Sequence, residues 1–286
     1  DAEPGPPSTL LETACCVPRP AHAAHAAVAY APPAKIFAGG SWLSRTCLRG
    51  SEHLDVVAAL PDGLIGPKDV ANGRYLEKRD VYLRACARAL RRGGLDASVS
   101  PLQGDDRAPI VIVRAPGARP VRVHAGWAAD AATIKKLAPG RNNVRDAAGG
   151  ADVPTRSYNA CLLRDTAHAR HVALIHRACS ATPAVGDAVV LTKLWLRTNG
   201  QLGRRDGGAT GFLASVVVVQ AAAQLSTSSA SSREDAALEI FRAALVAFSK
   251  WAPGAATFVE AGETPYPSIE DAWDWARPGG VAVVDA

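Results

Sequence analysis

Methionine is absent from all 286 residues, and aromatic residues make up only 6% of them. A translated chain begins with Met unless it is processed, so we expect this sequence to be part of a longer protein. The six cysteines form no Cys-x-x-Cys pair, which argues against a zinc site and favours free thiols in a reducing compartment. The longest apolar stretch, residues 212–225, is too short to cross a bilayer, and no secretory leader opens the chain. We therefore expect a soluble globular protein without a membrane partner.

Positive charge is concentrated in the middle of the sequence. Residues 131–205 hold twelve Lys or Arg and four Asp or Glu, whereas the remainder holds twenty and twenty-three. An ordinary solvated surface is the favoured interpretation of such a segment, and a patch that faces RNA phosphates is the functional alternative. Charge alone leaves both interpretations open.

Hydrophobic periodicity indicates three parts, the first two of which lie before residue 154. Residues 1–30 are rich in Ala, Pro and His and are expected to form a loosely ordered extension. The next part, residues 31–153, contains short apolar runs that end at Gly or Pro turns, as strands do, around one amphipathic helical segment. The expected strands are residues 35–38, 53–60, 109–113 and 120–124, and the helix begins at Pro67 or Asp69 and ends before Gly93.

The third part, residues 154–286, has helical periodicity. Asp187 is expected to cap one of its helices, and Asn199-Gly200 to end it. The expected helices span residues 159–178, 187–198, 210–225 and 234–250. A strand-rich part followed by a helical part predicts an α+β fold with two domains.

One segment has the layout of a nucleotidyltransferase site of the polymerase-β type, although by itself the pattern is more simply a turn followed by a strand, and only the resemblance given below favours the site. Gly40-Ser41 follows the first strand, and thirteen residues separate it from Asp55 on the second. Side chains two apart share one face of a strand, so a second carboxylate is expected at position 57, which is Val57. No Asp or Glu occurs from residue 107 to 129, where a later strand would supply a third. Two Mg²⁺ ions need several oxygen ligands, so we expect a vestigial site that holds no metal and no cofactor.

Motifs spread over residues 30–225 occur in the order of a known family. They are Pro32-Pro33-Ala34, Thr46-Cys47-Leu48-Arg49, Leu54-Asp55-Val56-Val57-Ala58-Ala59-Leu60-Pro61, Lys68-Asp69, Asn72, Arg74-Tyr75, Lys78-Arg79, Tyr82-Leu83, Arg141-Asn142-Asn143-Val144-Arg145, Tyr158-Asn159, Lys193-Leu194-Trp195-Leu196-Arg197 and Gly211-Phe212-Leu213. With these motifs the sequence resembles the nucleolar RNA-associated protein family (Nrap, also called nucleolar protein six).

The resemblance implies a tandem architecture. Each module of such proteins pairs a degenerate nucleotidyltransferase-like domain with a helical domain similar to those of poly(A) polymerase and oligoadenylate synthase. This chain would be the first module, and Val57 agrees with a degenerate site. The resemblance also implies a nucleolar location within the nucleus and membership of the small-subunit processome, which assembles on the precursor of 18S ribosomal RNA. The implied partners are pre-ribosomal RNA, other processome proteins and a smaller ribosomal RNA-processing protein.

The residues expected to contact RNA lie in and beside a basic loop. Cations and amides there could grip phosphates, or the same groups could join the two domains by hydrogen bonds to backbone atoms. The candidates are Lys135, Lys136, Arg141, Asn142, Asn143 and Arg145.

Two further motifs have ordinary structural explanations. Lys193 lies where active relatives of the helical domain have a lysine that can touch a nucleotide triphosphate. A core helix with Lys193 reaching along it to solvent is the favoured interpretation. His168 and His171, three residues apart, could share a metal ion, but partly exposed histidines without a common ligand are favoured.

Three functional hypotheses follow. The first is a non-catalytic scaffold that binds pre-ribosomal RNA. The second is an active RNA nucleotidyltransferase whose carboxylates come from Asp105, Asp106 or Asp130. The third is a purely protein–protein scaffold.

Overall fold

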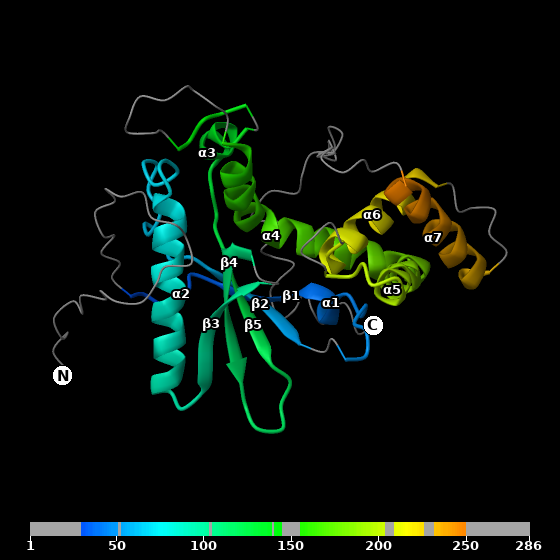
Figure 1. Cartoon of the computed structure of the whole chain (residues 1–286), viewed down its shortest axis with the longest axis horizontal. Coiled ribbons are helices and arrows are strands. Elements are labelled where there is room, and N and C mark those ends of the chain that lie inside the picture. Colours follow the sequence, from blue (N-terminus) through cyan, green and yellow to red (C-terminus); the bar gives the residue numbers. More distant parts are fainter. Residues whose placement is uncertain are drawn as a thin grey trace. The chain divides into compact units, whose positions relative to one another are not determined.

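The computed structural model describes residues 30–50, 53–102, 105–138, 140–144, 155–203, 209–225 and 232–249 (Figure 1). Two compact units are present. Unit 1 contains residues up to Ile36 and Val57–His168, and unit 2 contains Phe37–Val56 and the residues from Ala169 onward. The expected extension at residues 1–30 lies outside the described residues except for Tyr30. The domain limits 31–153 and 154–286 stay a prediction.

A five-stranded sheet has the order β1-β2-β5-β4-β3. β3 pairs antiparallel with β4, and β4 pairs antiparallel with β5. The strands are β1 (Ile36–Gly39), β2 (Leu54–Ala59), β3 (Asp96–Leu102), β4 (Asp105–Arg114) and β5 (Val121–Gly126). The sequence therefore predicted every strand except β3. That strand contains Pro101 and polar residues, and it is accommodated at the sheet edge, where the register shifts between Pro101 and Leu102.

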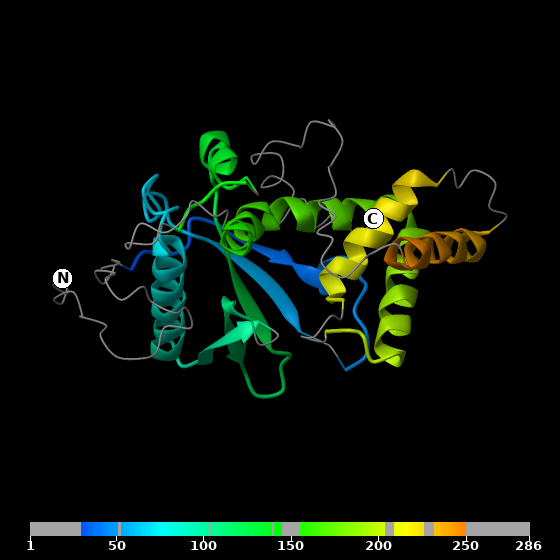
Figure 2. The ribbon, with the colours of Figure 1, turned by 45° about the horizontal axis from the view of Figure 1, so that its top comes forward.

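Helix α2 (Arg74–Arg92) packs along β3 and β4 on one face of the sheet (Figures 1 and 2). Its apolar stripe includes Tyr75, Tyr82 and Leu83, all at most 1% exposed, and forms the centre of the unit 1 core. The predicted start at Pro67 or Asp69 was wrong. Asn72 and Gly73 adopt positive φ angles of 58° and 77°, so the chain turns there and the helix begins after Gly73.

Unit 1 also contains α3 (Ala131–Lys136) and the first half of α4 (Arg156–Ala181). The sequence did not predict α3, because six residues are too few to show helical periodicity. Its signal is the capping residue: the backbone N–H of Thr133 donates to Asp130 Oδ1 at 2.6 Å.

Unit 2 is helical, as the sequence predicted. Its core lies between the second half of α4 and three later helices, which pack on one another (Figure 2). They are α5 (Pro183–Thr198), α6 (Gly211–Gln224) and α7 (Arg233–Ser249), and a short α1 (Gly40–Leu43) contacts α6. The predicted cap at Asp187 was wrong, because Pro183 begins α5 four residues earlier, and Asp187 instead pairs with Arg233.

Among the described residues, no helix combines the length and the apolar character needed to span a membrane. The α+β fold class predicted from the sequence is confirmed by the five-stranded sheet and the helices.

Candidate functional site

The Gly40-Ser41 turn lies directly against Asp55. Gly40 has a φ of 71°, and a Cβ atom placed there would be 2.0 Å from Asp55 Oδ2. Only glycine can therefore occupy this position while Asp55 keeps its place. Asp55 is 7% exposed, and its Oδ2 lies 3.4 Å from His53 Nε2. The structure thus brings the turn and the aspartate together, as the nucleotidyltransferase layout predicts.

Position 57 is part of the apolar packing of the sheet. Val57 is 0% exposed, and its Cγ1 would lie 2.8 Å from a Cβ atom added to Gly126 of β5. The isopropyl group therefore fills the space above a glycine on a neighbouring strand. β5 reads Val-Arg-Val-His-Ala-Gly and contains no carboxylate. Asp55 is thus the one acidic residue on β2 and β5.

The aspartates that an alternative metal site would need are engaged elsewhere in unit 1. Asp105 pairs with Arg107 at 3.2 Å and with Arg164 at 3.5 Å. Asp130 caps α3 through Thr133. The side chain of Asp106 lies outside the described part of the structure. Within the part of the chain that the structure describes, no group of three or more His, Cys, Asp or Glu could hold a metal ion.

Lys193 is buried, and the expectation that it reaches solvent was wrong. It is 5% exposed, and its Nζ donates to the carbonyl and the hydroxyl oxygen of Thr46 at 3.2 and 3.1 Å. One helical turn later on α5, Arg197 Nη1 donates to the Arg49 carbonyl at 2.8 Å. The two family motifs around Thr46 and Lys193 therefore meet in unit 2, which the sequence could not reveal.

Burial lowers the pKa of Lys193 to about 8, although Cys47, Cys179 and Asp55 favour its charged form. Its hydrogen-bond acceptors are neutral, so no partner in direct contact offsets the cost of burying the ammonium group.

Residues 40–49, hereafter the 40–49 loop, comprise α1 and the tightly hydrogen-bonded turn that follows it. The N–H of Arg45 donates to the Trp42 carbonyl at 3.1 Å, and that of Thr46 donates to the Ser41 carbonyl at 2.8 Å. The hydroxyls of Ser44 and Thr46 lie 2.9 Å apart. Arg45 has a φ of 54°, a left-handed conformation that costs a residue with a side chain on the order of 1 kcal/mol. The surrounding bonds therefore hold this loop in one shape.

The RNA-binding candidates lie at the end of α3 and in the loop that follows it. Lys135, Lys136 and Arg141 are exposed, so their charges are available to a polyanion. Asn142 is used locally, because its Oδ1 accepts from the Val144 N–H at 3.0 Å. Arg145 lies outside the described residues.

Asn143 holds this loop in place. Its Nδ2 donates to the Lys136 carbonyl at 2.9 Å and to Asn159 Oδ1 at 2.8 Å. Asn159, which is 1% exposed, in turn donates to the carbonyls of Ala138 and Arg141 at 3.0 and 2.9 Å. The side-chain amides of Asn143 and Asn159 are therefore engaged in hydrogen bonds within unit 1.

Sequence reasoning missed two cations beside this loop. The Asn72 N–H donates to the Asn143 carbonyl at 2.7 Å, which fixes residues 66–74 next to residues 141–144. Lys68 and Arg74 on that segment are exposed. Lys68, Arg74, Lys135, Lys136 and Arg141 together are called the cation patch. Both segments carry family motifs, but their contact depends on the tertiary fold.

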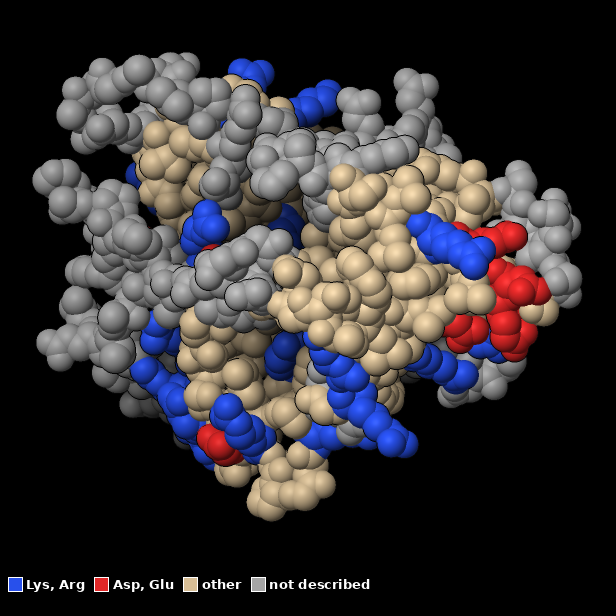
Figure 3. All heavy atoms as spheres, turned by 45° about the vertical axis from the view of Figure 1, so that its right-hand side comes forward, with Lys and Arg blue, Asp and Glu red and all other residues tan. Residues whose placement is uncertain are grey.

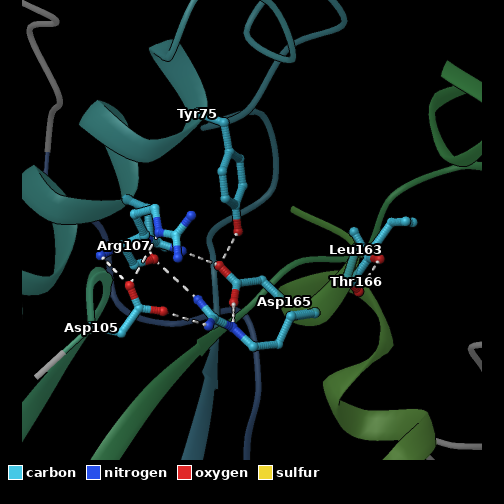
Figure 4. Close-up of polar contacts among 8 residues, drawn as sticks. Tyr75, Asp105, Arg107, Leu163, Asp165 and Thr166 are labelled. Atoms are coloured by element: carbon cyan, nitrogen blue, oxygen red, sulfur yellow. Dashed lines mark hydrogen bonds and ion pairs between the residues drawn. The ribbon is translucent and has the colours of Figure 1, made fainter. Parts of the chain in front are cut away.

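A second buried cation, Arg79, belongs to a polar network at the centre of unit 1 (Figure 4). Arg79 donates to Asp165 and, at 2.7 Å, to the Arg107 carbonyl, and the Tyr75 hydroxyl donates to Asp165 at 2.9 Å. Burial opposes ionisation of Asp165, yet Arg79 and Arg164 hold its pKa below the ordinary value. Burial also raises the pKa of Tyr75, with a further contribution from Asp165. The network joins α2 and α4, and its central residues Arg79, Tyr75 and Asp165 are buried.

The histidines of α4 turn to different partners. The ring of His168 lies 5.1 Å from that of His124, whereas the ring of His171 lies 5.4 Å from that of Phe212. The two are therefore not arranged around a common ion.

Figure 3 shows Lys and Arg spread over much of one face, with Asp and Glu gathered mainly at one edge.

Comparison with known proteins places this chain in a family. A family model described as Nrap protein domain 1 matches residues 9–181, more than half of the chain. Nucleolar protein 6 of Homo sapiens is 34% identical over 205 residues, covering 66% of this chain and 18% of the human protein. Nucleolar protein 6 of Mus musculus is 32% identical over 201 residues, covering 66% of this chain and 17% of the mouse protein. The matched region thus spans less than a fifth of these relatives, whose name confirms the expected nucleolar location within the nucleus.

Some solved structures are similar at a lower level. The polymerase core of TRAMP, an RNA surveillance complex, has a TM-score of 0.42 and 14% identity, covering 73% of this chain and 50% of that chain. The Escherichia coli MS115-1 CdnC:HORMA-deltaN complex has a TM-score of 0.39 and 18% identity, covering 76% of this chain and 55% of that chain. At these scores neither structure indicates what this chain binds or catalyses.

Proposed function

The chain belongs to the Nrap family and matches its first domain. We propose that it is a non-catalytic scaffold in ribosome biogenesis. The proposed setting is the small-subunit processome, on the precursor of 18S ribosomal RNA. Its partners there would be pre-ribosomal RNA and other processome proteins, including a smaller ribosomal RNA-processing protein.

The observation that carries the proposal is the packing of Val57. Two-metal catalysis requires carboxylates on one face of adjacent strands, and here a fully buried isopropyl group packs over a glycine instead. The lone Asp55 faces His53 and Gly40. An active enzyme would need Asp105 or Asp130 to leave the ion pairs and helix cap that now hold them. The second hypothesis is therefore the weaker one.

RNA binding is supported by the cation patch. Its residues are exposed, and the backbone that carries them is held by the Asn72, Asn143 and Asn159 hydrogen bonds. Cations on a rigid frame lose little freedom when they pair with phosphates, and such contacts do not depend on base sequence. The proposed contact is thus electrostatic and sensitive to salt.

The test is the salt dependence of RNA affinity. We expect the quadruple variant Lys135→Glu, Lys136→Glu, Arg141→Glu and Arg145→Glu to bind RNA more weakly. Its plot of log affinity against log salt should be flatter by roughly 0.7–0.9 per lost phosphate contact. A matched control reverses four other exposed arginines, namely Arg92, Arg114, Arg119 and Arg242. A quadruple variant whose slope equals that of the control would show that Lys135, Lys136, Arg141 and Arg145 do not touch RNA.

Crosslinking in the assembled particle distinguishes the third hypothesis, a purely protein–protein scaffold, from the RNA-binding scaffold. Nucleotides crosslinked to residues 131–205 are expected if this module binds RNA. A particle in which only protein crosslinks map to that segment would favour the protein scaffold.

A further inference from the structure

The 40–49 loop presents an aromatic ring and cations on a rigid support. Trp42 is 46% exposed. Arg45 and Arg49 are also exposed, as is Arg197, which holds the end of the loop from α5. No Asp or Glu occurs from residue 40 to residue 50. The exposed side of the loop therefore combines one flat ring with positive charge alone.

The opposite side of the loop is fixed to the unit 2 core. Thr46 is fully buried and accepts from Lys193, and Leu48 is 6% exposed. Together with the turn around Arg45, these contacts determine the backbone position of the exposed residues. Trp42 and Arg45 are joined by the hydrogen bond from the Arg45 N–H to the Trp42 carbonyl, so they belong to one turn. A residue held in a left-handed conformation by its surroundings is often part of a functional surface.

We infer that this loop is a docking platform for single-stranded RNA. An unpaired base would stack on the Trp42 ring, and Arg45, Arg49 and Arg197 would pair with phosphates. A ring beside cations is the combination that binds single strands without sequence preference, because every base has a flat face. A duplex keeps its bases stacked internally and cannot use the ring. Exposed Trp and Arg also occur in protein interfaces, but the absence of acidic residues on the loop favours a polyanion.

This inference rests on the proposed RNA-binding role but concerns a separate surface from the cation patch. Single-stranded contacts on unit 2 and phosphate contacts on unit 1 would give the chain two kinds of RNA interaction. The two surfaces share no residue, so mutations can test them independently.

The experiment measures fluorescence anisotropy of a labelled twelve-nucleotide oligouridine and a labelled RNA hairpin with the full 286-residue chain. We expect Trp42→Ala to weaken oligouridine binding about tenfold or more, within the range that loss of one stacking contact produces. Trp42→Phe, which keeps a flat ring, should retain most of the affinity. Trp195→Ala removes another exposed tryptophan, 41% exposed on α5, and should leave binding unchanged. Hairpin binding should be the same in all four proteins, and equal urea midpoints would show that folding is preserved.

The binding results can contradict either the inference alone or the proposed RNA-binding role as well. If the wild type binds oligouridine and Trp42→Ala binds it equally well, the platform does not bind RNA and Trp42 serves a protein interface. If the wild type binds only the hairpin, the inference fails while the proposed RNA-binding role stands. If the wild type binds neither RNA, the proposed role fails, and the inference fails with it.

Discussion

Two buried cations, one in each unit, differ in the groups that surround them. Arg79 in unit 1 is 1% exposed and meets a carboxylate, a hydroxyl-bearing ring and a backbone carbonyl in one network. Lys193 in unit 2 is 5% exposed and donates only to neutral oxygens of Thr46. The first charge is matched by Asp165, whereas the second has no carboxylate within hydrogen-bonding distance.

The difference separates a buried charge with a counter-ion from one without a direct counter-ion. A buried ion pair fixes the relative positions of the elements it joins. A buried lysine without a direct counter-ion destabilises the fold unless an anion or deprotonation relieves it. We therefore expect Arg79 to contribute to stability, and Lys193 to limit it while holding the 40–49 loop in position.

Removal of Arg79 should have the largest effect. Arg79→Met leaves Asp165 buried without its cation and is expected to cost about 3–5 kcal/mol of unfolding free energy. The measurement is urea unfolding at pH 7, with Arg92→Met on the exposed end of α2 as the control. The comparison would be wrong if Arg79→Met cost no more than the control.

The same network should make the stability of unit 1 fall at acid pH. The pKa of Asp165 is lower in the folded chain than in the unfolded chain, so its contribution is present above the unfolded value of about 4 and is lost as the pH falls below it. In Arg79→Met, burial raises the folded pKa of Asp165 because the cation that lowered it is gone, so the loss of unfolding free energy on acidification should be smaller than in the wild type. An equal loss in the two proteins would contradict the ion pair.

Lys193 should show a pH dependence of the same sign, but in the alkaline range. Its folded pKa of about 8 lies below the ordinary value of 10.5, so between these values the unfolded chain binds more protons. The unfolding free energy should therefore rise with pH across this window, by at most about 1.4 kcal/mol per unit. Lys193→Met should lack that rise, whereas Lys135→Met, which changes an exposed lysine, should retain it. Parallel pH profiles for the wild type and Lys193→Met would show that the buried ammonium group carries no cost.

Arg233 should matter least, because its pair with Asp187 lies on the surface. The two side chains are 56% and 43% exposed and meet at 2.6 Å. Solvent screens such pairs and holding them in place costs side-chain entropy. Arg233→Gln should therefore leave the unfolding midpoint unchanged within experimental error. A clearly lower midpoint would show that this exposed pair contributes to stability as a buried pair does.

The sequence predicted what depends on local pattern. The strand with Asp55 and Val57, the glycine turn before it and the helices of unit 2 all follow from periodicity and turn residues. Strand β3 was missed because its edge position, not its composition, allows Pro101. The burial of Lys193 and the contact of Asn72 with Asn143 were missed because both depend on residues distant in sequence. Neither contact leaves a signal that a single sequence can show.

The most direct test of the scaffold account is nucleotide incorporation into an RNA primer. The wild-type chain and Asp55→Asn are incubated with Mg²⁺ or Mn²⁺, all four nucleotides and RNA at a concentration that saturates binding. We expect RNA to bind and both proteins to show the same background, because Val57 leaves Asp55 without a second metal ligand. Incorporation by the wild type that is abolished in Asp55→Asn would contradict the account.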